Sequence, residues 1–452
     1  MANIDVTQLI DRRRLGWFNW KVVLFGFFLT LFEGFDGGTV SYVSPVIIKE
    51  WGIVDMRALG LTFSLGLAAT FVGAPLLGWI ADRYGRKPAI VTSALLVSLT
   101  SLATMAASNL VQLAVLRFIT GIGIGGLMPT IIALNAEYAP KRYRATLITV
   151  MFTGLTLGAG LPGTVAGWLM AHHGWQSLFL VGGIITLLIT AVSALWLPES
   201  IKYLVLHGRH RDASRLVAEL APGTDLAAAR FIVSEERAPR GFSPRLLFTD
   251  GLRFITPLLW LLAICNTGTF YFVTTWLPTV LHSSGIPLTR SALALTFFQV
   301  GGTAGGLSIA RPLDRIGLMP VCVLFLLAIP ITISIGYAAL WSQTALMVAV
   351  FLAGFTLLGL QFGINATSAL IYPTAFRANG SGWTFAIGKV GSVTGPLVAG
   401  FLIGMHLPIQ QLYLFLAVPL TVATLAAFVL ARLYFVRFHG MALNRRDAIA
   451  AE

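Results

Sequence analysis

Long, continuous apolar runs dominate the chain, and short polar segments separate them. Twelve of these runs are long enough to cross a bilayer, because about 20 apolar residues span the hydrocarbon core. The predicted spans are 21–48, 59–81, 88–107, 111–138, 146–171 and 175–197 in the first half, and 254–281, 291–312, 318–337, 343–372, 379–404 and 410–436 in the second. None of the runs alternates with period two, as barrel strands do. The pattern predicts an all-α membrane protein.

The only long polar segment, residues 198–252, divides the spans into two sets of six. Within it, Arg209–Leu220 has the pattern of a surface helix, and the regions 221–225 and 239–244, which contain Pro and Gly, have that of a linker. The predicted organisation is an N-terminal six-helix bundle (1–197), a central loop (198–252), and a C-terminal six-helix bundle with a tail (253–452).

An internal repeat supports two pseudo-symmetric bundles. Asp82–Gly85 recurs as Asp314–Gly317, again directly after the second span of a half. Gly158 and the segment 165–167 recur at nearly the same spacing, as Gly391 and 398–400 in the fifth span of the second half. Matches in register at several places of a six-span unit are typical of transporters built from parallel repeats.

Composition and charge narrow the class further. Of the 452 residues, 56% are hydrophobic and only 11% are charged, whereas soluble domains have about 25% charged residues. The net charge of +13 does not indicate nucleic-acid binding, because the basic residues lie between apolar runs. With both termini in the cytoplasm, 26 of the 31 Lys and Arg residues lie on the cytoplasmic side and three on the opposite side. This asymmetry is the positive-inside pattern of a multi-span membrane protein.

Four charged residues stand out because they lie well inside predicted spans, away from the ends: Glu33, Asp36, Arg117 and Lys389. Such residues are costly in a membrane, at about 2.5–3.5 kcal/mol each on insertion scales, and they usually mark a functional site. Glu33 and Asp36 share a helical face, and repulsion between two carboxylates favours holding a proton on one of them. We therefore expect proton coupling by Glu33, Asp36 and Arg117. A purely structural ion pair with Arg117 remains the alternative, and Lys389 could instead extend to the membrane surface.

Three motifs resemble those of the major facilitator superfamily. Gly78–Lys87 resembles its signature loop, Arg117–Gly123 its span-4 motif associated with proton coupling, and Gly154–Gly167 its glycine-rich span-5 motif. The resemblance implies the major facilitator fold, with twelve transmembrane helices in two six-helix bundles. Residues 121–126 also satisfy the dinucleotide pattern G-x-G-x-x-G, but within a membrane run close helix packing is the better interpretation.

Two further segments resemble one family of that superfamily, the aromatic acid:proton symporters. They are Phe32–Gly38 in span 1 and Tyr372–Trp383 at the junction of spans 10 and 11. Members usually carry two aspartates in span 1, and Glu33 replaces the first here. They commonly carry an arginine in span 11, and this chain has Lys389, which lacks the bidentate fork of arginine. The resemblance implies proton-coupled import of small aromatic carboxylates of the benzoate or hydroxybenzoate type.

This hypothesis assigns roles to particular side chains. Lys389 or Arg117 is expected to meet the substrate carboxylate. The expected ring contacts and hydroxyl-reading residues are Phe35, Tyr271, Trp276, Phe298, Trp383, Asn266, Gln299, Gln361 and Asn365. A cytoplasmic gate is expected from Asp82, Arg83, Arg86, Glu137, Arg144, Glu199, Asp314, Arg315 and Arg377. The gate would hold one state of an alternating-access cycle and open in the other.

Other functions remain open at this point. The chain could be a proton symporter for another organic anion or a sugar-like solute, or a transporter-like receptor that binds without translocating. An enzyme is not expected, because no nucleophile–base pair and no metal-ligand spacing is present. We expect no cofactor and no metal, and the partners to be an aromatic acid, protons and the lipid bilayer. The expected location is a bacterial inner membrane, and the expected functional form is a monomer.

Overall fold

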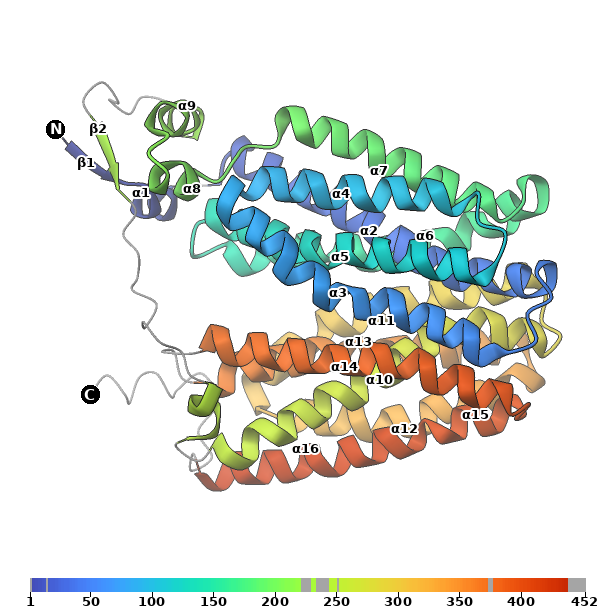
Figure 1. The fold of residues 1–452 in the computed structure, drawn as a ribbon. Helices are drawn as coiled ribbons and strands as arrows, with labels where there is room; N and C mark the ends of the chain where they lie inside the picture. The colour runs from blue at the N-terminus through green and yellow to red at the C-terminus, as the bar shows by residue number, and fades with distance from the viewer. Residues whose placement is uncertain are drawn as a thin grey trace. The chain divides into compact units, whose positions relative to one another are not determined.

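The computed structural model describes residues 2–13, 15–220, 229–232, 244–249, 252–372 and 377–437. Twelve helices in this part of the chain are long and apolar enough to cross a membrane, which confirms the predicted number. In the first half they are α2 (Trp17–Glu50), α3 (Met56–Tyr84), α4 (Arg86–Thr104), α5 (Leu110–Tyr138), α6 (Arg144–His173) and α7 (Gln176–Trp196) (Figure 1). In the second half they are α10 (Leu252–Ser283), α11 (Leu288–Ile316), α12 (Met319–Trp341), α13 (Gln343–Ile371), α14 (Arg377–Gly404) and the pair α15 (Ile409–Phe415) and α16 (Ala417–Arg437).

The last span is interrupted at Leu416, between α15 and α16. Pro419 lies in the first turn of α16 and has no N–H to donate. Its ring would also clash with the carbonyl four residues earlier, at Phe415, if one regular helix continued through this point. The break is therefore a local consequence of sequence within one apolar segment.

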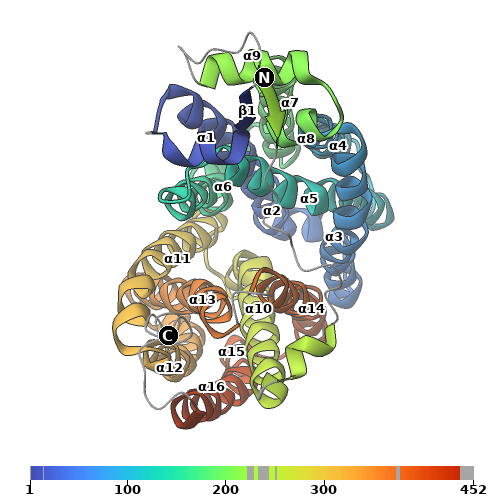
Figure 2. The same cartoon turned by 90° about the vertical axis from the view of Figure 1, so that its left-hand side faces the viewer.

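Two compact units make up the chain. Unit 1 comprises residues 1–39, 65–159 and 172–237, and unit 2 comprises 40–64, 160–171 and 238–452. The sequence-based division at 197 and 253 follows the halves of the chain, whereas this division assigns part of α2, α3 and α6 to unit 2. In unit 2, α10 packs against α14 and α16, and α13 packs against α11 and α12 (Figure 2).

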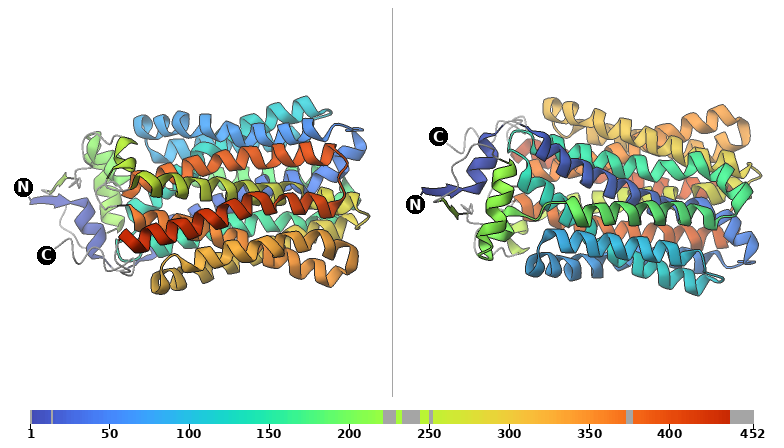
Figure 3. Two further views of the ribbon diagram at one scale, coloured as in Figure 1. Left: turned by 90° about the horizontal axis from the view of Figure 1, so that it is seen from below. Right: turned by 90° about the horizontal axis from the view of Figure 1, so that it is seen from above.

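A small cap covers one end of unit 1, and most of it was not predicted. Strand β1 (Ala2–Asp5) pairs in parallel with β2 (Ala229–Ile232), next to α1 (Val6–Arg12), α8 (Ile201–Leu206) and α9 (His210–Leu220) (Figure 3). Helix α9 confirms the predicted surface helix. A short 3-10 helix, η1 (Pro244–Phe248), precedes α10. The predicted linker residues 221–225 and 239–243 lie outside the described residues.

Apolar residues hold this cap to the spans. Val6, Val217 and Phe231 are buried in one cluster with Leu134 of α5 and Leu197 after α7. The N-terminal segment therefore contributes to the packing of unit 1 through its apolar side chains. This end also includes the α3–α4 junction with Arg83, Arg86 and Lys87. We call it the basic end of unit 1.

The internal repeat is confirmed at the level of helix crossings. A Cβ on Gly158 would lie 1.8 Å from the Leu31 carbonyl oxygen, and one on Gly391 would lie 2.3 Å from that of Ile264. Leu31 and Ile264 are related by the same repeat offset as the two glycines. Only glycine permits such close approach of two helices, so α6 crosses α2 as α14 crosses α10.

The glycine run in α5 serves the same purpose. A Cβ on Gly121 would lie 2.0 Å from the Gly66 carbonyl oxygen of α3, and its counterpart Gly354 in α13 faces Phe298 of α11 at 1.9 Å. This supports close helix packing, rather than nucleotide binding, as the role of residues 121–126.

Candidate functional site

A buried ion pair lies inside unit 1. Arg117 Nη1 of α5 donates to Asp36 Oδ2 of α2 at 2.9 Å, and the two residues are 6% and 2% exposed. Arg117 Nη2 donates to Thr104 Oγ1 at 3.0 Å, at the end of α4. The guanidinium also lies 5.1 Å from the ring centre of Phe179 in α7. Four helices therefore position one charge pair in an apolar interior.

The second span-1 carboxylate lies one turn earlier on the same helix. Glu33 is 5% exposed, so α2 buries two acidic residues that share a face. Phe35, which lies between them in the sequence, is also buried. A Cβ built on Gly182 would meet the Phe35 ring. Among the described residues, Asp36 Oδ1 accepts no hydrogen bond. Arg117 therefore holds only one of the two carboxylate oxygens.

Unit 2 has a buried cluster of neutral polar groups. Gln361 Oε1 of α13 accepts hydrogen bonds from Asn266 Nδ2 at 3.1 Å and from Thr267 Oγ1 at 3.0 Å, both of α10. Asn266 is fully buried, and its Nδ2 also donates to the Leu357 carbonyl at 3.1 Å. Its Oδ1 is buried and accepts no bond from the described residues.

Lys389 lies in the turn of α14 that packs on this cluster. A Cβ on the preceding Gly388 would lie 3.6 Å from Thr267 Oγ1. Lys389 is half-buried, and its Nζ lies 5.5 Å from the centre of the Phe385 ring. Trp383, about two turns earlier, is 38% exposed and stacks on Trp260 at 6.2 Å. Helix α14 therefore carries a cation and aromatic rings, and the neighbouring helices α10 and α13 carry buried amides.

The remaining predicted contacts in unit 2 occupy varied environments. Trp276 is 1% exposed, donates Nε1–H to the Pro396 carbonyl at 3.1 Å and meets Phe63 edge-on. Phe298 is fully buried against Phe270, and Tyr271 lies half-buried beside Phe270. Gln299 is 7% exposed with a buried Oε1 that accepts no bond from the described residues, whereas Asn365 is exposed.

Part of the predicted gate of unit 1 forms a network at the basic end of that unit. Arg86 Nη1 pairs with Asp82 at 2.8 Å, and its Nε lies 3.7 Å from Glu137. Glu137 also accepts a hydrogen bond from the Ser200 hydroxyl. The acidic gate residues therefore find their partners within unit 1, around Arg86.

Glu199 has a specific structural role in this network. Its Oε1 accepts bonds from the backbone N–H groups of Arg86 at 2.8 Å and Lys87 at 3.2 Å. These are unsatisfied donors at the start of α4, which a carboxylate stabilises. Gly85 makes the approach possible, because its φ is +110° and a Cβ there would lie 2.2 Å from Glu199 Oε2. The Pro-Glu-Ser segment after α7 thus caps α4.

The basic gate residues are held by other groups. Arg83 lies over the rings of Trp79 and Tyr84, at 5.5 and 5.8 Å. Arg144 lies 3.9 Å from Asp11 of the cap. In unit 2, Arg377 Nε donates to the Tyr372 carbonyl and Arg315 is exposed. The side chain of Asp314 and residues 373–376 lie outside the described part.

Several partners of these residues carry no signal in the sequence. Thr104, Phe179 and Thr267 contact the charged or amide groups, and Asp11 pairs with Arg144. Threonines and aromatics are common in membrane spans, so no pattern marked these positions. In the described part of the chain, no group of three or more His, Cys, Asp or Glu side chains could hold a metal ion.

Twelve apolar helices, a duplicated set of helix crossings and buried charges together define a multi-pass membrane transporter. The chain belongs to the Major Facilitator Superfamily, whose family profile matches residues 26–334. It is a transporter and not an enzyme.

Relatives cover nearly the whole chain. A gallate transporter of Pseudomonas putida is 36% identical, over 94% of this chain and 94% of that protein. The 4-hydroxybenzoate transporter PcaK of the same organism is 34% identical, over 94% and 96%. A benzoate transport protein of Acinetobacter baylyi is 28% identical, over 94% and 92%.

Solved structures agree in fold. A bacterial homologue of the lysosomal transporter Spinster, inward-facing and occupied, matches with a TM-score of 0.71 at 16% identity over 93% of this chain and 98% of that one. The xylose transporter XylE of Escherichia coli matches with a TM-score of 0.65, at 16% identity over 94% and 98%. The family profile and the relatives named for gallate, 4-hydroxybenzoate and benzoate confirm the predicted resemblance to transporters of aromatic acids, and the solved structures confirm the fold.

Proposed function

We propose that the protein is a proton-coupled symporter that imports small aromatic carboxylates, of the benzoate or hydroxybenzoate type, by alternating access. The observation that carries the proposal is the buried Asp36–Arg117 pair, one turn from buried Glu33. It combines a carboxylate that can exchange a proton with a cation that stabilises its charged form. The relatives named for gallate, 4-hydroxybenzoate and benzoate support the substrate class.

Electrostatics explains why such a carrier needs a proton. Moving one elementary charge against the membrane potential costs about 2.3 kcal/mol per 100 mV. A monoanion that enters a negative interior with one proton avoids this cost. A second proton would let the potential drive uptake. Asp36, with one oxygen not bonded to Arg117, is the proposed carrier, and Glu33 is the second candidate.

The polar groups of unit 2 suggest how the substrate is read. Lys389 would bind the carboxylate, and the Trp383 and Phe385 rings lie on the same helix. Asn266 Oδ1 and Gln299 Oε1 are buried acceptors without a bond from the described residues, which is an unfavourable state. A phenolic hydroxyl would supply the missing donor. We therefore favour hydroxylated benzoates over benzoate itself.

The distribution of Lys and Arg residues supports one orientation of the protein in the membrane. We place the basic end of unit 1 and both termini in the cytoplasm, because Lys and Arg accumulate on the cytoplasmic side of membrane proteins. The host membrane would be a bacterial inner membrane, and a single chain would carry out transport.

Uptake into proteoliposomes tests the proposal. Radiolabelled 4-hydroxybenzoate and gallate should accumulate when the outside is acidic, and a protonophore should abolish accumulation. Unlabelled benzoates should compete, whereas sugars should not. Uptake driven by sodium and insensitive to the protonophore would refute proton coupling, and binding without any uptake would indicate a receptor.

A further inference from the structure

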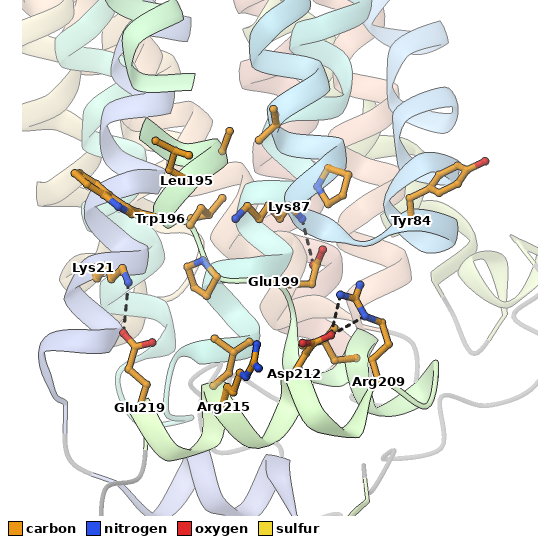
Figure 4. Close-up of a pocket in the computed structure, with 17 residues that line it drawn as sticks. Lys21, Tyr84, Lys87, Leu195, Trp196, Glu199, Arg209, Asp212, Arg215 and Glu219 are labelled. Atoms are coloured by element: carbon orange, nitrogen blue, oxygen red, sulfur yellow. Dashed lines mark hydrogen bonds and ion pairs between the residues drawn. The ribbon is translucent and has the colours of Figure 1, made fainter. Parts of the chain in front are cut away.

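Unit 1 contains a cavity of about 650 Å³ at its basic end. The cavity lies among the starts of α2 and α4, the end of α7, and the surface helix α9 (Figure 4). The residues proposed to carry protons and to bind substrate do not line it. Its lining includes four cations, Lys21, Lys87, Arg209 and Arg215.

Two of these cations are already neutralised. Lys21 pairs with Glu219 at 3.4 Å, and Arg209 pairs with Asp212 at 2.8 Å. The third carboxylate in the lining, Glu199, caps the backbone of α4.

The side-chain charges of the other two cations, Lys87 and Arg215, have no carboxylate within 4 Å among the described residues, and the Glu199 carboxylate that interacts with the Lys87 charge is already bound to backbone N–H groups of α4. Figure 4 shows Lys87 at the start of its span and Arg215 on the helix that crosses below it, with the cavity between them. Two such cations on separate helices that face one cavity favour an anion with several oxygen acceptors.

The other wall of the cavity is apolar and exposed. Leu195 and Trp196, in the last turn of α7, are 74% and 63% exposed and line the same cavity. A tryptophan at the end of a span is typical of the level of the lipid head groups. The cavity thus joins a cationic site to a surface suited to acyl chains.

We propose that this cavity binds an anionic phospholipid of the phosphatidylglycerol type, with its phosphate between Lys87 and Arg215 and its acyl chains along Leu195 and Trp196. Basic pockets between helices at the membrane surface recognise lipid head groups in this way. Inorganic phosphate offers the same charge but has nothing to place against Leu195 and Trp196. The bound lipid would connect α9 of the cap to α4 and α7.

Native mass spectrometry of the delipidated full-length protein tests this proposal. Phosphatidylglycerol should bind about tenfold or more tightly than phosphatidylcholine of the same chain length, since only the former has net charge. In Lys87→Gln with Arg215→Gln this preference should fall to about twofold or less, because both cations facing the phosphate are gone. The single variant Arg215→Gln, on an exposed side chain, should lose part of the preference and provides the measurement if the double variant does not fold.

Arg211→Gln is the matched control. Arg211 is an exposed residue of the same helix that does not line the cavity, and the substitution removes the same charge. It should keep the preference for phosphatidylglycerol. An equal loss in Arg211→Gln, an unchanged preference in the Arg215 variants, or complete displacement of the lipid by millimolar inorganic phosphate would overturn the proposal.

Discussion

The two units share a set of helix crossings, but positions that carry buried charges in unit 1 carry neutral side chains in unit 2. Gly158 approaches Leu31 in unit 1 as Gly391 approaches Ile264 in unit 2, and one constant offset along the sequence relates both pairs. At the same offset, Asp36 corresponds to Thr269 and Arg117 to Val350. The charged pair of unit 1 thus has a hydroxyl and an apolar side chain as its counterparts.

Two other matched positions also differ, and at the first of them the charge lies in unit 2 instead of unit 1. Lys389 of unit 2 corresponds to Thr156 in unit 1, and Asn266 corresponds to Glu33. The glycine contacts fix the backbones of both units, so side chains between them can diverge without changing the fold. In the proposed mechanism this divergence separates two tasks, with proton exchange in unit 1 and recognition of the anion and its hydroxyls in unit 2.

The largest expected effect is at the charged pair. Asp36→Asn keeps the shape and can still accept a bond from Arg117, but it cannot release a proton. The variant should exchange labelled for unlabelled substrate and should lose accumulation against a gradient entirely. It should also be destabilised, because breaking a buried pair costs about 3–5 kcal/mol. Counterflow and uphill uptake in proteoliposomes measure the two activities separately.

Matched variants show whether the role is coupling or structure. Thr269→Val, at the counterpart position in unit 2, should retain accumulation, since the threonine hydroxyl bonds only to the Cys265 carbonyl among the described residues. Asp36→Asn with Arg117→Gln should restore stability but not accumulation. Normal uphill uptake by folded Asp36→Asn would remove Asp36 from the mechanism and leave Glu33 as the candidate.

The next effect is at the single cation proposed to bind substrate in α14. Lys389→Ala should remove a charge-assisted contact of about 1.5–3 kcal/mol, or roughly 10- to 150-fold in affinity for 4-hydroxybenzoate. Lys389→Arg should retain most binding, because it keeps the charge. Binding can be measured by isothermal calorimetry in detergent. Normal affinity of the alanine variant would assign the carboxylate to Arg117 instead.

Much of this comparison was predictable from sequence. Apolar runs of about 20 residues give the spans, because the bilayer fixes their length. Charges within spans identify Asp36, Arg117 and Lys389, because such residues are costly there. The recurrence of Gly158 as Gly391 predicts the repeat, and the structure shows its physical basis in two equivalent helix crossings.

Partners were less predictable than charges. Thr104 and Thr267 resemble the other threonines of the spans in sequence. Only their tertiary contacts with Arg117 and Gln361 distinguish them. Glu199 was predicted as one of several charged gate residues, and its bonds to backbone N–H groups of α4 depend on tertiary contact that its place in the sequence does not indicate. The pairing of β1 with β2 joins the start of the chain to its central loop, which no local pattern encodes.

A smaller effect should sharpen the assignment of hydroxyl recognition to unit 2. Asn266→Leu removes the buried acceptor Oδ1 while keeping similar volume. It should weaken binding of 4-hydroxybenzoate by about 5- to 30-fold relative to benzoate, as expected for one hydrogen bond of about 1–2 kcal/mol. Competition by each acid against the other gives the ratio directly. Equal losses for the two acids would show that Asn266 serves packing and not the ring hydroxyl.

The smallest expected effect is a difference in stability between alanine variants of the two signature loops. The loops carry matched glycines, Gly85 and Gly317, with different surroundings. Gly85 has a φ of +110° and a Cβ there would meet Glu199, whereas its counterpart Gly317 has a φ of +68° and nothing within 4 Å among the described residues. Alanine is strained at both positions, by about 1–3 kcal/mol. Gly85→Ala should also displace the cap of α4, adding about 0.5–2 kcal/mol. Gly85→Ala should therefore have the lower thermal unfolding midpoint in detergent.

A double-mutant cycle assigns that difference to Glu199. In a Glu199→Ala background the cap is already gone and the clash is relieved, so Gly85→Ala should cost only its backbone strain. Its effect should then fall into the range expected for backbone strain alone, as for Gly317→Ala, at about 1–3 kcal/mol. If Gly85→Ala is equally harmful with and without the Glu199 carboxylate, the contact contributes nothing and the loops of the two units differ only in backbone conformation. If the effects converge, the Pro-Glu-Ser segment is what distinguishes the basic end of unit 1 from the equivalent loop of unit 2.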